Sequence, residues 1–239
     1  MNELGKKIHH IYEKYKHLLL LLYFPIYLLW FAYIEKTVTT HFHVIHMEID
    51  DYIPFCEVFI VPYLLWFAYI AVVVIYMAFK DKNDFKKMCI FLYTGMTIFL
   101  IISTVFPNGH FLRPASFERD NIFTQLCAML YKTDTATNLF PSIHVYNSIA
   151  VHFAIIYNEK LKKKKWICNT SAVLMISIVL STVFLKQHSV FDVLTALLLA
   201  FVMQQLVYIR SWEKIPAKVP QKTKVKAHSK EKEKSLPQM

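Results

Sequence analysis

Residues 166–208 read WICNTSAVLMISIVLSTVFLKQHSVFDVLTALLLAFVMQQLVY. This segment contains two apolar runs, and a helix of roughly 20 such residues crosses the ~30 Å hydrocarbon layer of a membrane. The two runs are joined by the short polar stretch LKQHS at 185–189. Two long apolar runs joined in this way predict a pair of antiparallel membrane-spanning helices, with the polar joint at one membrane face.

Four more apolar runs precede this pair. Hydrophobic residues make up 56% of the 239 residues and charged residues only 18%, against about 25% charged in ordinary soluble chains. We therefore expect an all-α, polytopic membrane protein, a six-transmembrane-helix bundle that forms one domain over residues 1–212. The predicted spans are residues 17–34, 55–79, 89–106, 141–157, 166–185 and 189–208.

Lysine and arginine are spread unevenly over the segments that connect these runs. The net charge is +10, and alternate segments hold 22 and 5 of the 27 basic residues. Because basic residues are retained on the cytoplasmic side, both termini are expected in the cytoplasm. Residues 213–239 are basic and lack apolar periodicity, which predicts a disordered cytoplasmic tail. No aromatic residues alternate with its lysines, so a nucleic-acid partner is not expected.

Several classes of site are disfavoured by the sequence. With three glycines, the chain has neither of the glycine-rich phosphate loops GxGxxG and GxxxxGK[ST], and its four cysteines form no CxxC pair. No cofactor and no metal is expected. His41, His43 and His46 lie beside acidic residues, as metal ligands can, but a solvated loop is favoured because such short spacings need a specific loop geometry. Residues 116–131 predict an amphipathic helix along the outer surface.

Three polar clusters fall at span ends on the non-cytoplasmic side. The first contains Arg113, the second is PSIH at 141–144, and the third is HSVFD at 188–192. His144 and His188 are 44 residues apart. This number of residues corresponds to a descending helix, a lysine-rich turn and a returning helix. Both histidines are therefore expected at the outer ends of neighbouring helices.

These residue types suit phosphoryl chemistry. His188 and Asp192 are spaced i and i+4, so the carboxylate can accept one ring N–H and leave the other nitrogen as a nucleophile. The start of the fourth span, with Pro141 as its first residue, offers backbone N–H groups to an anion. Arg113 is one of only three arginines, and its planar fork matches two phosphate oxygens.

The three clusters resemble the signature blocks of the type 2 phosphatidic acid phosphatase (PAP2) superfamily over about residues 85–210. The matching positions are Arg113-Pro114, Pro141-Ser142-x-His144 and His188-x-x-x-Asp192. Phe106 and Thr182 stand where the family usually has a lysine and an arginine, and Ile143 stands where it has glycine. This looser pattern is more similar to the sphingolipid/inositolphosphoryl transferase-like branch.

The resemblance implies a membrane lipid-phosphate phosphatase or phosphotransferase that acts, without metal, through a phosphohistidine at the outer membrane face. His188 is the expected nucleophile, Asp192 orients it, and His144 is the acid and base. The phosphate oxygens are expected to bind Arg113, Ser142 and Lys186. The expected partners are a lipid phosphate and membrane lipids, and the lysine-rich, aromatic-rich composition fits a bacterial plasma membrane. The alternative is a degenerate, non-catalytic protein that binds or translocates a lipid phosphate.

Overall fold

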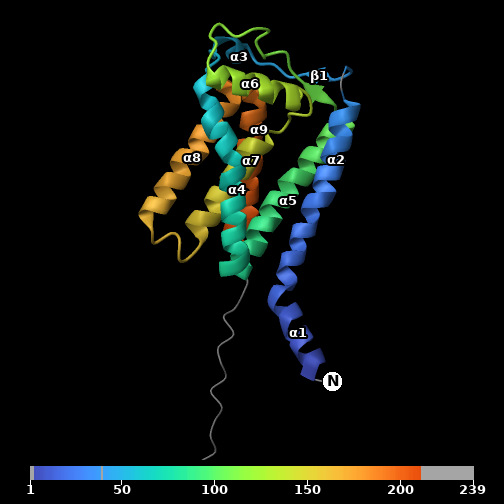
Figure 1. Ribbon diagram of the computed structural model, residues 1–239, viewed down its shortest axis with the longest axis vertical. Helices are drawn as coiled ribbons and strands as arrows, with labels where there is room; N and C mark the ends of the chain where they lie inside the picture. Colours follow the sequence, from blue (N-terminus) through green and yellow to red (C-terminus); the bar gives the residue numbers. More distant parts are fainter. Residues whose placement is uncertain (1–2, 39, 211–239) are drawn as a thin grey trace, which may run out of the picture.

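The computed structural model describes residues 3–38 and 40–210, and the predicted tail at 213–239 lies outside them. Helices dominate the described part of the chain (Figure 1). The N-terminal segment comprises α1 (Glu3–Tyr15), a 3-10 helix η1 (Lys16–Leu22) and α2 (Tyr23–Thr37). The last segment comprises α9 (Val190–Gln204) and a π-helical turn η3 (Gln205–Ile209).

Five helical segments in the described ranges are long and apolar enough to cross a membrane. They identify an integral, multi-pass membrane protein and confirm the all-α polytopic class. The helix at the predicted fourth span, α7 (Ile143–Tyr157), is apolar but only 15 residues long. The five segments are His9–Thr37, Glu57–Lys80 (η2, Glu57–Phe59, with α4, Ile60–Lys80), α5 (Lys82–Val105), α8 (Lys165–Phe184) and Val190–Ile209.

Two helix starts differ from the sequence-based boundaries. Helix α5 begins at Lys82 rather than at residue 89, because the Asp81 carboxylate accepts the backbone N–H groups of Asn83 and Asp84, both at 3.1 Å. An N-cap of this kind stabilises a polar first turn ahead of the apolar run. Helix α7 begins at Ile143 rather than at Pro141, because Ser142 is its N-cap.

Helix α7 lies at the centre of the bundle, where it contacts α4, α5, α8 and α9. Most of its side chains are buried, whereas α4, α8 and α9 expose many large apolar side chains on their outer faces. Apolar side chains on an outer face suit a lipid environment. A central position also explains why a helix shorter than its neighbours is sufficient here, since the surrounding helices cover it.

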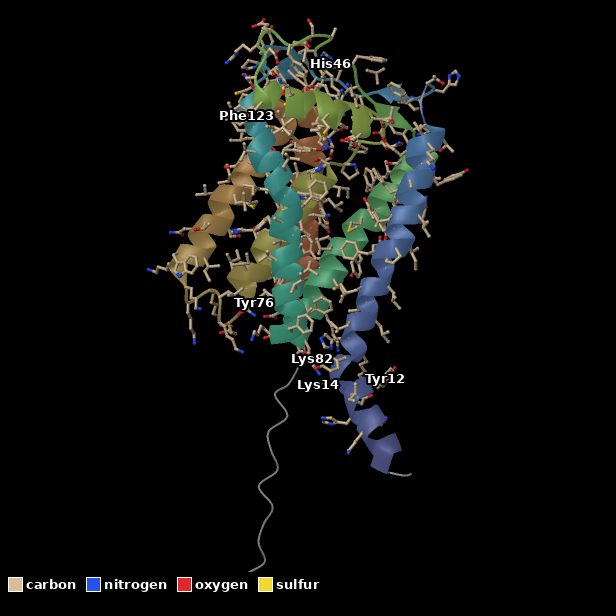
Figure 2. All side chains as sticks on the ribbon, viewed as in Figure 1. Tyr12, Lys14, His46, Tyr76, Lys82 and Phe123 are labelled. Atoms are coloured by element: carbon tan, nitrogen blue, oxygen red, sulfur yellow. The ribbon has the colours of Figure 1, made fainter. Side chains whose placement is uncertain are left out.

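Short elements cover one end of the bundle (Figure 1). There α6 (Ile122–Thr133) crosses over the helix ends. A helix is thus present in the stretch predicted at 116–131, but it begins only at Ile122, because Asn121 is its N-cap. The short helix α3 (Glu48–Tyr52) lies beside it, and β1 (His43–Val44) pairs in parallel with β2 (Asn108–Gly109). Figure 2 shows His46 at this end and Lys14 and Lys82 at the opposite end, which agrees with the uneven distribution of basic residues.

Helix α5 packs tightly against α7 at Gly95. A Cβ added at Gly95 would lie 2.0 Å from the Tyr146 ring, and the Tyr146 hydroxyl donates to the Phe91 carbonyl oxygen at 2.7 Å. Tyr146 is fully buried. The ring therefore occupies the space that any other residue at position 95 would need.

Replacing Gly95 with alanine should destabilise the protein by about 1–3 kcal/mol, because overpacking forces the Tyr146 ring from its position. Thermal unfolding in detergent measures the effect. Ile90→Ala on the same helix is the control, since Ile90 is 56% exposed and faces away from this contact. A Gly95→Ala protein that unfolds at the wild-type temperature would contradict the packing described here.

Candidate active site

The structure brings together the three residues expected to carry the chemistry. His144 lies in the first turn of α7, and His188 lies in the turn between α8 and α9. Their ring centroids are 5.8 Å apart. The Nδ1 atom of His188 lies 3.4 Å from Oδ2 of Asp192, whose side chain is fully buried. The predicted convergence of these residues at one end of the bundle is therefore seen in the structure.

Hydrogen bonds of the backbone hold the turn that carries His188 in place. The N–H groups of Gln187 and His188 donate to the Thr182 carbonyl oxygen at 2.9 and 3.0 Å, and the Ser189 N–H donates to Asp192 Oδ2 at 3.0 Å. Lys186 adopts a left-handed backbone conformation with φ of 51°, which reverses the chain after α8. Thr182, at a position where the resemblance suggests an arginine, thus holds the turn through its backbone.

Ser142 connects α7 to α9. Its Oγ accepts the Val145 N–H at 3.4 Å, and its own N–H donates to the Asp192 carbonyl oxygen at 3.3 Å. The segment leading to it is held by Asn108, whose side-chain oxygen accepts the N–H groups of Leu139 and Phe140 at 2.8 and 3.0 Å. These contacts fix the first turn of α7, and with it His144, against the start of α9.

Arg113 is held by main-chain and side-chain oxygens. Its Nη1 donates to the Asp134 carbonyl oxygen at 2.6 Å, and its Nη2 donates to the Thr135 carbonyl oxygen at 3.0 Å and to Gln187 Oε1 at 2.8 Å. The guanidinium also lies 4.6 Å from the centre of the Tyr131 ring. Among the described residues, its Nε has no hydrogen-bond partner. Arg113 therefore links the residue before His188 to the segment that follows α6.

A cavity of about 290 Å³ adjoins the two histidines. Asp134 lines it, and burial raises the pKa of this carboxyl although the charge of Arg113 acts in the opposite direction. The His144 ring stacks on Tyr63 at 4.6 Å and contacts Trp66 at 4.4 Å between centroids. The sequence analysis singled out neither Asp134 nor these aromatic residues. The other aromatic side chains of the lining are Tyr27, Phe31, Phe67 and Phe99.

A second, almost wholly apolar cavity of about 420 Å³ continues from the first. It lies among α2, α4, α5 and α7, farther from the histidines. Both cavities share five lining residues: Tyr27, Leu28, Trp66, Phe67 and Ile143. Together they form one apolar groove that reaches the histidine pair.

Lys186 lies away from the histidine rings. Its Nζ donates to the Asp50 carbonyl oxygen at 2.6 Å, and burial lowers its pKa although the neighbouring aspartates act in the opposite direction. None of the three predicted phosphate-binding residues, Arg113, Ser142 and Lys186, is among the residues that line the cavity beside His188. The ammonium group of Lys186 points to α3, in the segment that joins α2 to η2.

The histidines of the first outer loop have separate partners. His43 stacks on Phe106 at 4.3 Å between centroids, and Nε2 of His46 lies 2.9 Å from Oδ1 of Asp51. Within residues 3–38 and 40–210, no group of three or more histidine, cysteine or acidic side chains is arranged to hold a metal ion.

His110 is a buried residue that the sequence analysis left without a role. Its Nε2–H donates to the Gln187 carbonyl oxygen at 2.9 Å, and its Nδ1 accepts the Leu112 N–H at 3.2 Å. Burial lowers the pKa of His110 to about 4. A proton on Nδ1 would also oppose the Leu112 N–H, so the folded protein keeps this ring neutral.

The segment that contains these site residues matches a known family model. Residues 112–216 match the family model described as the PAP2 superfamily. The matched range includes Arg113, residues 141–144 and residues 188–192, and it covers less than half of the chain. The match is to the superfamily as a whole and specifies no branch. No curated protein and no solved structure matches the chain. A PAP2-type match suggests activity on lipid phosphates in general.

The neutral His110 should make the fold sensitive to acid. The unfolded chain binds this proton near pH 6.5, whereas the folded protein binds it only near pH 4. The stability that His110 contributes is thus complete above pH 6.5 and is lost as the pH falls, by up to about 3 kcal/mol at pH 4.

Unfolding temperatures in detergent between pH 7 and pH 4 measure this loss. His110→Gln should show a shallower decline than the wild type. His46→Gln is the control and should not flatten the decline. The Asp51 contact raises the pKa of His46 and stabilises the fold on the acid side, so its loss makes the decline steeper than in the wild type. An identical decline in His110→Gln and wild type would contradict the neutral, buried ring.

Proposed function

We propose that this protein is a membrane lipid-phosphate phosphatase or phosphotransferase that works through a phosphohistidine on His188. The observation that carries the proposal is the His188 ring, held between the buried Asp192 carboxylate and the His144 ring at the head of an apolar groove. The match of residues 112–216 to the PAP2 superfamily supports it.

In the first step, His188 attacks the phosphorus atom. Asp192 accepts the Nδ1–H, so Nε2 keeps its lone pair and forms the N–P bond. The bond between phosphorus and the ester oxygen breaks, and the electron pair leaves with that oxygen. His144 donates the proton that the departing alcohol needs.

In the second step, neutral His144 takes a proton from water or from an acceptor alcohol. The resulting oxygen nucleophile attacks phosphorus, the N–P bond breaks, and its electron pair returns to Nε2 of His188. Water yields free phosphate, and an alcohol yields a new phosphate ester. Asp192 stabilises the positive charge that the imidazole carries while the N–P bond exists.

The phosphate oxygens require donors where negative charge develops. The first turn of α7 supplies backbone N–H groups beside Ser142. Arg113 supplies positive charge next to His188, while its Nη atoms donate to Asp134, Thr135 and Gln187. In this proposal Lys186 acts through Asp50, because its ammonium group binds that residue's carbonyl oxygen.

The groove favours a lipid over a water-soluble phosphate ester. Its two connected cavities measure about 290 and 420 Å³ and are mainly lined by aromatic and aliphatic side chains. An apolar chain in this groove would leave the phosphate at the histidines. We further propose six spans with both termini in the cytoplasm, supported by the lysines at the end opposite the site (Figure 2).

Transfer to an acceptor alcohol is the second candidate function. Phe106 and Thr182 occupy positions at which the PAP2 superfamily usually has a lysine and an arginine. The loss of these cations makes the pattern more similar to the transferase-like branch. The same groove would also accommodate the apolar chain of a lipid alcohol. A phosphodiester has less negative charge than a monoester and needs fewer cations, which favours transfer from a phospholipid donor.

His188→Asn should lower phosphate release or headgroup transfer by about 10³-fold or more, because no other group can form the covalent intermediate. Purified protein in vesicles is given labelled phosphatidic acid, and then a labelled phospholipid with diacylglycerol or ceramide as acceptor. The first assay reports hydrolysis and the second reports transfer.

His46→Asn is the matched control, since His46 is exposed and pairs with the exposed Asp51. It should keep wild-type turnover in both assays. Full activity in His188→Asn would refute the mechanism. Wild-type protein that binds the lipids without turning over either of them would support the non-catalytic alternative instead.

A further inference from the structure

Asp50 lies in α3, in the first outer loop and outside the segment that matches the PAP2 superfamily. Its side chain is only 2% exposed. A carboxylate is rarely buried unless hydrogen bonds or charges compensate it. The partners of Asp50 therefore show what this buried charge does.

One partner is local, since the Met47 N–H donates to Oδ2 of Asp50 at 2.8 Å, and the others surround His188 in the sequence. Oδ1 of Asp50 accepts the Val190 N–H at 2.8 Å, and Oδ2 accepts the Ser189 hydroxyl at 2.6 Å. The carbonyl oxygen of Asp50 accepts the Lys186 ammonium at 2.6 Å. One residue of a distant loop thus holds the chain on both sides of His188, across about 140 residues of sequence.

Asp50 and Asp192 divide the donors of Ser189 between them. The hydroxyl of Ser189 binds Asp50, and its backbone N–H binds Asp192 Oδ2, the same oxygen that faces Nδ1 of His188. Both carboxylates also lie at the N-terminus of α9, where the helix dipole favours negative charge. The position of the His188 ring relative to Asp192 therefore depends on where Asp50 holds Ser189.

The distance from His188 Nδ1 to Asp192 Oδ2, 3.4 Å, is already long for a hydrogen bond. A small further movement of the turn would break this contact and free the imidazole to rotate. A reacting group displaced by about 1 Å can cost ~10²-fold in rate. A small movement of the turn that Asp50 holds would therefore displace the His188 imidazole and lower the reaction rate strongly.

We propose that Asp50 is a positioning residue for His188. It fixes the 186–190 turn from the first outer loop, so that the imidazole keeps its Nδ1–H on Asp192 and its Nε2 toward the phosphate. The proposal rests on the proposed function, because it assigns to Asp50 the geometry of that reaction's nucleophile. Its neighbour Asp51 is exposed and pairs with His46, so the two adjacent aspartates have different roles.

The first test compares Asp50→Asn with Asp51→Asn in purified, full-length protein. The amide at position 50 keeps the shape of the side chain but loses one acceptor oxygen. Asp50→Asn should lower kcat by ~10²-fold and change KM by less than about threefold, because the lipid-binding groove is untouched. Asp51→Asn should keep both constants at the wild-type values.

The second test measures the His188 ring without turnover. Diethyl pyrocarbonate modifies accessible neutral imidazoles, and peptide mass spectrometry gives the modification rate of each histidine. The rate at His188 should rise several-fold in Asp50→Asn, because the ring is no longer held. The rate at His10, which is exposed in α1 at the opposite end of the bundle (Figure 1), should stay unchanged. This measurement does not need an active enzyme, so it separates a failure of the proposed function from a failure of this inference.

Ser189→Ala provides a second variant, which removes the hydroxyl bound to Asp50 and, with it, the N-cap that accepts the Phe191 N–H at 3.1 Å. It should lower kcat in the same direction, and the double variant should lose less than the product of the two single losses, because both remove one interaction. If Asp50→Asn does not fold, Ser189→Ala alone decides the kinetic and the modification tests.

A folded Asp50→Asn with wild-type kcat and an unchanged modification rate at His188 would overturn the proposal. So would a rise in KM at constant kcat, or an equal loss in Asp51→Asn. If the wild type turns over none of the lipids, the modification rates decide the inference by themselves.

Discussion

A buried carboxylate at the start of α9 is the constraint on which the rest of the site depends. Asp192 is fully buried, and its Oδ2 faces both the Ser189 N–H and the Nδ1 of His188. Its carbonyl oxygen accepts the Ser142 N–H and so connects α9 to α7. A charge in this environment is tolerable only when donors and a helix N-terminus surround it. The groups that contact Oδ2 of Asp192 belong to the turn that places His188, whereas its Oδ1 has no hydrogen-bond partner within the described residues.

The helix bundle by itself does not complete the site. Two connecting segments converge on the turn that carries His188: Asp50 of α3 binds its flanking residues, and His110 and Arg113, in the segment between α5 and α6, bind Gln187. The apolar groove approaches the same point from within the bundle. We infer that the transmembrane helices provide the lipid-binding surface, whereas the outer loops set the geometry of the chemistry.

The sequence could predict what depends on length and periodicity. Apolar runs revealed most of the membrane helices, and the 44 residues between His144 and His188 were enough to bring their rings to within 5.8 Å. It could not predict Asp50 or His110, because their partners are about 140 and 77 residues away in loops without periodicity. The starts of α5 and α7 were also missed, since capping residues rather than hydropathy determine them.

The most direct test of the account is to locate the phosphoryl group during turnover. His144→Ala retains the nucleophile but lacks the proposed base for the second step, so a phosphoenzyme should accumulate. The variant is mixed with labelled lipid phosphate, quenched in alkali to preserve the N–P bond, and digested for mass spectrometry. The account predicts an acid-labile phosphoryl group on His188. A phosphoryl group on another residue, or turnover without any phosphoenzyme, would contradict it.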